Sequence, residues 1–295
     1  MKKILVPCDF SRPSVNAFRM ALNLAQLSNG TVHLLKVIEL PVINDAIIAP
    51  VMDFEEQLLT ELKNRTEKEF VKITRKYNVE DVRVVTHVRF GAVAASIFEY
   101  AKSASIDIIV MGSHGSSGFM EFLIGSNAEK IVRGSSVPVL IVKDYYKGPV
   151  RNIVFPNTLL AGGNADFVSK VKALQRFFKA HLHIVWINTP LNFSSDTITS
   201  ERLQSFAKNH NLNDYTIHIF NYRDEEEGIL EFARFIRGDL IAMATRSRKG
   251  VAHIIHGSIT ENVVNHSDKP VWTYTLRNEP DYDFNVEGTL IAYES

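Results

Sequence analysis

The chain is built from one sequence unit that occurs twice. Eight residues of the first half recur in the second half at a constant separation of 132 positions. The matched pairs are Met111 and Met243, Gly118 and Gly250, Gly125 and Gly257, Ser126 and Ser258, Glu129 and Glu261, Val132 and Val264, Ser135 and Ser267, and Pro138 and Pro270. A fixed separation marks an internal repeat, so the 295 residues predict two copies of one domain rather than one large domain.

Nearer the N-terminus the two copies align at a larger separation. Residues 4–7 match residues 153–156 at 149 positions, and residues 32–34 match residues 182–184 at 150 positions. The second copy is therefore shorter by about 17 residues, which are missing between its second strand and the segment that matches at 132 positions. Glycine and proline near the midpoint mark a linker. The expected domains are residues 1–145 and 150–276, followed by an acidic tail at 277–295.

Short β-branched segments alternate with longer segments of helical periodicity. In the first copy we expect strands at 3–8, 31–38, 82–88, 106–112 and 137–143, with helices at 12–28, 52–77, 91–104 and 125–134. In the second copy we expect strands at 151–155, 181–187, 215–220, 239–244 and 270–274. The segment 107–111 is apolar on both faces, as a strand covered by helices on each side would be. The pattern predicts an α/β fold with two tandem doubly wound, Rossmann-like parallel sheets.

Composition narrows the possible functions. The chain has 33 basic and 33 acidic residues, so it lacks the general basic field that attracts nucleic acid or anionic membranes. Its single cysteine, Cys8, excludes an internal disulfide framework and a multi-cysteine metal site, and fits a reducing compartment. No apolar run approaches the roughly 20 residues that span a bilayer, and the first apolar run is too short for a signal peptide. We expect a cytoplasmic protein that keeps its N-terminus, with neither nucleic acid nor a membrane as partner.

Two segments of the first copy should lie where an open α/β sheet binds ligands, beyond the carboxyl ends of strands at the point where their order reverses. One follows the first strand at 7–9, and the other follows the fourth strand. There Gly112 and Gly115 let the backbone turn and approach a ligand closely, because they lack a Cβ. Gly125 and Ser126 open the next helix, whose backbone N–H groups favour an anion. Together these segments predict a phosphate cradle.

The pattern Gly-x-x-Gly, nine residues, Gly-Ser resembles that of the nucleotide-binding members of the universal stress protein family. The resemblance covers essentially the whole chain as two tandem domains, strongly in the first copy and more weakly in the second. It implies the strand order 3-2-1-4-5 in each domain, and ATP or AMP, with or without Mg²⁺, bound to the first. Asp9 would then hydrogen-bond the adenine or ribose. The implied site residues are Pro7, Asp9, Val37, Met111, Gly112, His114, Gly115, Gly125, Ser126 and Asn127.

Several of these residues also have a plain structural explanation. An aspartate at the end of a strand is often a turn or cap residue, which applies to Asp9. Val37 and Met111 could equally pack in the core. His114 could be a structural loop residue rather than a catalytic one, and Cys8 a small buried one, because no basic neighbour in sequence would lower its pKa.

The second copy has lost much of the motif. The replacements are Ala244 for Gly112, Ser247 for Gly115, His256 for Ile124, Ile259 for Asn127 and Thr158 for Asp9, while Gly257 and Ser258 remain. A Cβ at 244 and 247 would restrict the backbone and crowd a phosphate, so the second copy is not expected to bind ATP in the family manner. Its loop carries Arg246, Arg248 and Lys249, which read either as a solvated basic loop or as a contact for an anion or the acidic tail.

The last strand of each copy would be an apolar edge. These strands cover 137–143 and 270–274, and an uncovered apolar edge invites pairing. In the family that the sequence resembles, domains dimerise through this strand. The two copies are therefore expected to pair within one chain as a pseudo-dimer, with further homodimerisation left open.

Three functions are compatible with the sequence. A nucleotide-binding stress-response module would change the conformation that an unidentified protein partner meets. A slow ATP hydrolase would need a metal and a group that orients water, but no P-loop and no acidic pair after the cradle is present, so no catalytic residue is predicted. A purely structural interaction module would bind no nucleotide. The motif at 112–126 favours the first function, and the dinucleotide fingerprint Gly-x-Gly-x-x-Gly is missing after the first strand.

Overall fold

The computed structural model describes residues 1–39, 52–77, 81–113, 125–146, 148–157, 165–246 and 259–276, with two short strands at 282–284 and 290–292. The first half contains β1 (Lys3–Pro7), α1 (Arg12–Ser28), β2 (Thr31–Ile38), α2 (Met52–Lys76), β3 (Arg83–Phe90), α3 (Val93–Ser103), β4 (Ile108–Gly112), α4 (Ser126–Gly134) and β5 (Val139–Val142). The second half contains β6 (Asn152–Pro156), α5 (Ala165–Phe178), β7 (His181–Asn188), α6 (Asp196–Asn209), β8 (Tyr215–Asn221), α7 (Glu225–Phe235), β9 (Leu240–Arg246), α8 (Ile259–His266) and β10 (Val271–Leu276).

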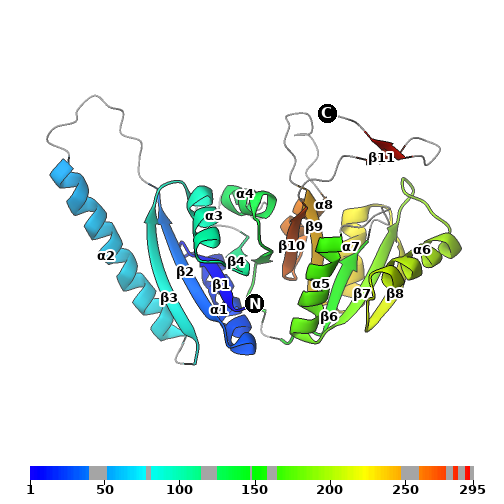
Figure 1. The fold of residues 1–295 in the computed structure, drawn as a ribbon, viewed down its shortest axis with the longest axis horizontal. Coiled ribbons are helices and arrows are strands. Elements are labelled where there is room, and N and C mark those ends of the chain that lie inside the picture. Colours follow the sequence, from blue (N-terminus) through cyan, green and yellow to red (C-terminus); the bar gives the residue numbers. More distant parts are fainter. Residues whose placement is uncertain are drawn as a thin grey trace.

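Both halves have the predicted topology, and they share one sheet. Its ten strands lie in the order β3-β2-β1-β4-β5-β10-β9-β6-β7-β8. Each half therefore has the expected order 3-2-1-4-5, with parallel pairing inside the half. The halves lie side by side along the long axis of the molecule (Figure 1). Near the C-terminus, β11 (Tyr282–Phe284) and β12 (Leu290–Ala292) form a separate antiparallel pair.

The shorter second copy is explained mainly by one helix. The α2 helix has 25 residues, whereas its counterpart α6 has 14. Both helices connect the second and third strands of their halves, where the sequence predicted the shortening.

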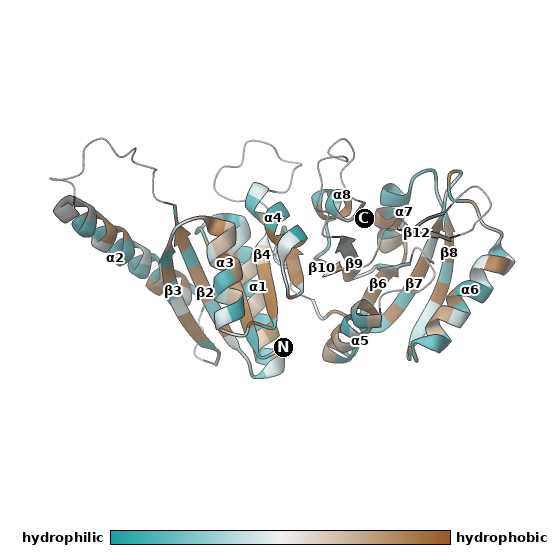
Figure 2. Cartoon of the chain, turned by 45° about the horizontal axis from the view of Figure 1, so that its top comes forward, coloured by the Kyte–Doolittle hydropathy of each residue, from teal (hydrophilic) through white to brown (hydrophobic). Residues whose placement is uncertain are grey.

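Residues of alternate strand positions fill two cores, one on each face of the sheet. Ile4 and Val6 pack with Phe18 of α1, while Leu5 packs with Ile97 of α3, and all five side chains are fully buried. Figure 2 shows the apolar residues concentrated along the strands, with polar residues on the outer faces of the helices. A strand buried on both faces has its ends fixed by packing, and this positions the segments that follow β1 and β4.

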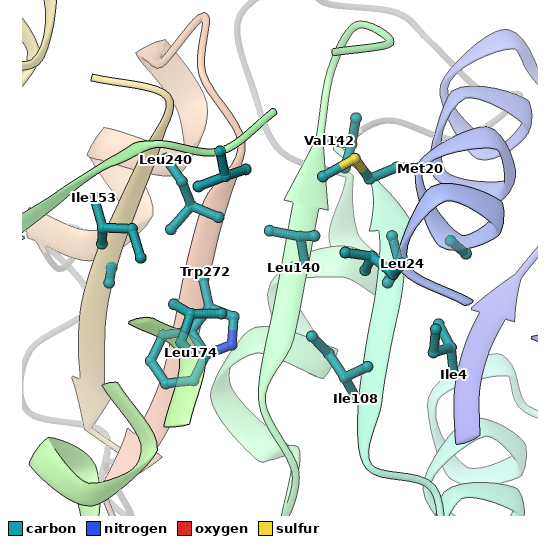
Figure 3. Packing of buried hydrophobic residues seen from close by; sticks show 14 of the residues in the cluster. Ile4, Met20, Leu24, Ile108, Leu140, Val142, Ile153, Leu174, Leu240 and Trp272 are labelled. Atoms are coloured by element: carbon teal, nitrogen blue, oxygen red, sulfur yellow. The ribbon is translucent and has the colours of Figure 1, made fainter. Parts of the chain in front are cut away.

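The seam between the halves is an antiparallel pairing of β5 and β10. Leu140 lies opposite Trp272, which is 1% exposed and stacks near Phe167. Figure 3 shows Trp272 and Leu174 of the second half facing Leu140 of the first. On the other side of the sheet, the guanidinium of Arg133 donates two hydrogen bonds to Glu261, at 2.5 and 2.6 Å. The predicted intramolecular pseudo-dimer is confirmed.

Candidate functional site

The strand order of the first half reverses between β1 and β4. From β1 the chain moves outward to β2 and β3, and it returns to the other side of β1 at β4. Ile4 lies opposite Ile108 in this pair, and extending that register places Cys8 level with Gly112. The segments that follow the two strands therefore meet at one edge of the sheet, where open α/β folds bind their ligands.

The turn from β1 to α1 is held by its own polar side chains. The carboxylate of Asp9 accepts hydrogen bonds from the backbone N–H of Ser11 at 3.0 Å and from its hydroxyl at 2.5 Å. The Ser11 side chain in turn caps α1 by accepting from the Ser14 N–H. Phe10 has a φ of 68° and packs 5.3 Å from Phe70. Asp9 is thus a turn residue, which leaves its role toward a ligand as a proposal.

Gly112 is required by packing inside the protein. A Cβ at this position would lie 2.6 Å from the backbone carbonyl carbon of Pro13, in the first turn of α1. The missing side chain therefore lets α1 approach the end of β4. Sequence reasoning assigned this glycine to the ligand and overlooked Pro13, because the contact joins residues that are distant along the chain.

The two ends of the glycine-rich segment are joined by a backbone hydrogen bond. The Gly125 N–H donates to the Ser113 carbonyl at 2.8 Å, and the Ser113 N–H donates to Val142 on β5 at 3.3 Å. Ser113 is 1% exposed. Sequence reasoning did not select this residue, although it lies inside the motif. His114 and Gly115, which the motif includes, lie outside the described residues.

Helix α4 begins directly after this junction without a side-chain cap. Its N-cap is Gly125, with φ −61° and ψ 144°, and this residue has no side chain that could bond to the N–H groups of the first turn. Ser126 is exposed and Asn127 is half-buried. An uncapped helix N-terminus carries partial positive charge and free donors, so it can bind an anion.

Two of the predicted site residues, Val37 and Met111, lie in the hydrophobic core. Val37 is 8% exposed and Met111 is 7% exposed, in the same cluster as Leu5. Pro7, the last residue of β1, is half-buried. Cys8 is 3% exposed, and burial raises the pKa of its thiol. The prediction of a small buried cysteine is confirmed, while ligand contact by the other three residues stays a prediction.

The equivalent edge of the second half is arranged differently. Thr260, in the first turn of α8, donates its hydroxyl hydrogen bond to the carbonyl of Ala244 at 2.7 Å. Its first-half counterpart is Ala128, which cannot make this bond. Ile259, in place of Asn127, is 38% exposed. The replacements Thr158, Ser247 and His256, the side chain of Arg246, the residues Arg248 and Lys249, and most of the tail lie outside the described residues.

Two further features bear on function. Among the described residues, no three His, Cys, Asp or Glu side chains gather as a metal-binding group would. Within the same ranges, none of the helices has both the length and the apolar character needed to cross a membrane.

Taken together, these features define a tandem Rossmann-like α/β protein with a strand-end site in its first half. The family model described as "Universal stress protein family" matches residues 1–143 and 192–274. The chain belongs to the universal stress protein family.

The chain is similar to individual proteins of known sequence or structure. A universal stress protein of Methanocaldococcus jannaschii is 31% identical over 143 residues, which cover 48% of this chain and 82% of that protein. The crystal structure of a universal stress protein from Archaeoglobus fulgidus covers 92% of this chain and 98% of its own, with a TM-score of 0.73 and 20% identity. Another solved universal stress protein, described as a complex with cAMP, covers 43% of this chain and 98% of its own at a TM-score of 0.36 and 17% identity.

Proposed function

We propose that the first half binds an adenine nucleotide, ATP or AMP, and that the protein acts as a cytoplasmic stress-response module. The observation that carries the proposal is the junction of Ser113 with Gly125 at the uncapped start of α4. It brings backbone N–H donors to the edge where the order of β1 and β4 reverses. Backbone donors and a helix terminus can hold a phosphate without a basic surface, which fits a chain without net charge.

The proposed site uses the residues selected from the sequence. They are Pro7, Asp9, Val37, Met111, Gly112, His114, Gly115, Gly125, Ser126 and Asn127. The proposed division of the chain is a nucleotide-binding domain at 1–145, a degenerate domain at 150–276 and an acidic tail at 277–295. In the second half, Ala244 and Ser247 stand in place of Gly112 and Gly115, and their Cβ atoms would crowd a phosphate, which supports one nucleotide per chain rather than two.

Calorimetry and native mass spectrometry of the full chain test the proposal. We expect one AMP or ATP per chain, and we expect the variant Gly115→Val, Gly125→Val to lose binding because its side chains would crowd the phosphate. Circular dichroism should show that this variant remains folded. Two nucleotides per chain, or full binding in the variant, would contradict the assignment.

A time course of phosphate release distinguishes a nucleotide binder from a slow hydrolase. The proposal predicts that bound ATP is released unchanged, with and without Mg²⁺, because no water-orienting group is assigned to the site. Steady release of phosphate by the purified chain, abolished in the Gly125→Val variant, would instead establish an ATPase.

A further inference from the structure

A small cavity lies in the first half, away from the strand-end site. It has a volume of about 170 Å³ and lies between α1, the end of α2 and the segment that joins the halves. Its lining residues are Arg19, Leu22, Asn23, Gln26, Tyr77, Val82 and Tyr145. Pockets for nucleotide-sized or drug-sized ligands usually measure roughly 300–1,000 Å³, so this cavity suits only a small molecule.

The guanidinium of Arg19 lies over two aromatic rings. Its guanidinium carbon lies 3.6 Å from the ring centroid of Tyr145 and 5.3 Å from that of Tyr77. Asn23 donates to the Tyr145 hydroxyl at 3.2 Å and so helps to fix that ring. Stacking engages the flat face of a guanidinium and leaves its in-plane N–H donors available, in the fork geometry that matches a carboxylate.

Among the described residues, no side chain neutralises the charge of Arg19. Within the part of the chain that the structure describes, Arg19 makes no ion pair or hydrogen bond, and no acidic residue lines the cavity. A second cation, Lys76, lies with its Nζ 5.5 Å from the Tyr77 ring. The cavity therefore combines positive charge with apolar walls from Leu22 and Val82, which are 8% and 7% exposed.

The same place in the second half is closed by hydrogen bonds. Val168 stands in place of Arg19, at the separation of 149 positions, and is 2% exposed. Lys172, in place of Asn23, donates to the His210 carbonyl at 2.8 Å. Gln175, in place of Gln26, donates to the carbonyls of residues 213 and 214. In the first half the corresponding groups line an open cavity instead.

We propose that the cavity around Arg19 is a binding site for a compact organic carboxylate. The carboxylate pairs with the in-plane donors of Arg19, and its flat apolar body lies against the tyrosine rings and Leu22. Inorganic phosphate fits less well, because it has no apolar part to lie against Leu22 and Val82, and because Arg19 is the one cation among the described residues that line the cavity. The site is independent of the proposed nucleotide site.

NMR titration of the ¹⁵N-labelled full chain tests the proposal, with benzoate and inorganic phosphate as separate probes. The Arg19 Nε–H signal is assigned by its loss in Arg19→Lys. We expect benzoate to shift this signal until it saturates. Arg19→Gln should weaken benzoate binding about tenfold or more, because it removes the charged fork. Binding to this variant is measured from the signals of nearby backbone amides. Arg19→Lys should also bind more weakly, because it keeps the charge but loses the fork.

Matched variants separate a specific site from general attraction of anions. Arg176→Gln removes one exposed positive charge from α5 and should leave benzoate binding unchanged, as should the Gly115→Val, Gly125→Val variant. Tyr145→Phe keeps the stacked ring and should bind within about twofold of the parent chain. A shift that does not saturate, or equal weakening by Arg176→Gln, would overturn the site. Equal affinity for phosphate would overturn its assignment to carboxylates.

Discussion

In the first half, α4 begins without a side-chain cap, whereas in the second half the first turn of α8 is tied to β9 by Thr260. The halves nevertheless share equivalent structural contacts. Asp107 accepts backbone hydrogen bonds from Lys2 and Lys3, and its counterpart Asp239 accepts them from residues 151 and 152. The repeat has kept the contacts that join its elements, while the strand-end site has diverged.

The seam shows a second difference between equivalent positions. Leu140 and Trp272 are counterparts at the separation of 132 positions, and they lie opposite each other in the β5–β10 pair. A symmetric pair of identical domains would place two equal side chains here. The seam of this chain instead places a large residue against a smaller one, so its packing is asymmetric.

The largest expected effect is the loss of the seam tryptophan. Trp272→Ala should reduce the free energy of unfolding by about 3–5 kcal/mol, because it opens a cavity in a buried contact. Leu140→Ala should cost less, since it removes a smaller side chain from the same place. Urea unfolding of both variants measures the difference. A loss below about 1 kcal/mol in Trp272→Ala would show that the seam contributes little to stability.

Exchanging the residues at the strand ends tests the comparison at β4 and β9. Gly112→Ala should destabilise the chain by about 1–3 kcal/mol, because the new Cβ would meet the backbone of Pro13. The reciprocal change, Ala244→Gly, should stay within about 1 kcal/mol, the usual cost of a glycine in a strand. Thermal unfolding followed by circular dichroism measures both. Equal effects would mean that the two strand ends are packed alike.

The ion pair between the halves is present on one side only. Arg133 bonds Glu261, whose side chain is 9% exposed, whereas the counterpart of Arg133 is Asn265. Arg133→Ala should therefore cost about 1–3 kcal/mol, because it removes the two hydrogen bonds that Arg133 donates to a buried carboxylate. Lys130→Ala, on the exposed face of the same helix, is the control and should change stability by less than about 0.5 kcal/mol. Urea unfolding measures both variants. Similar losses of unfolding free energy in the two would show that the Arg133–Glu261 pair does not stabilise the seam.

The smallest expected effect concerns two equivalent histidine pairs. His33 stacks on His87 in the first half, and His183 contacts His218 at 3.1 Å in the second. Burial, together with the positive charges that His181 and His218 can carry, lowers the pKa of His183 to about 4. The pKa of His33 is also lowered, first by burial.

Because the folded pKa of His183 is depressed, its neutral form is favoured in the folded state. Its contribution to stability is thus fully present above pH 6.5, the ordinary value, and is lost as the pH falls toward 4. His183→Gln should flatten the decline of the melting temperature over this window by a few degrees. His33→Gln is the matched variant from the first half. A flattening by His33→Gln as large as that by His183→Gln would contradict the difference between the halves.

The sequence by itself determined the tandem fold. The separation of 132 positions predicted two copies, the alternation of strands and helices predicted parallel doubly wound sheets, and the family resemblance implied the order 3-2-1-4-5. Hydrophobic periodicity and internal repeats are properties of the order of residues along the chain, so they can be recognised from the sequence alone. The apolar segments at 137–143 and 270–274 even indicated the seam correctly, because an apolar edge strand needs a partner.

Only the tertiary structure decided which partner each residue has. It showed that Gly112 makes room for Pro13, that Asp9 holds its own turn, and that Arg133 lacks a symmetric counterpart. It also revealed the cavity around Arg19, whose walls come from segments far apart in sequence. Such contacts depend on distances between side chains after packing, and no local pattern of residues encodes those distances.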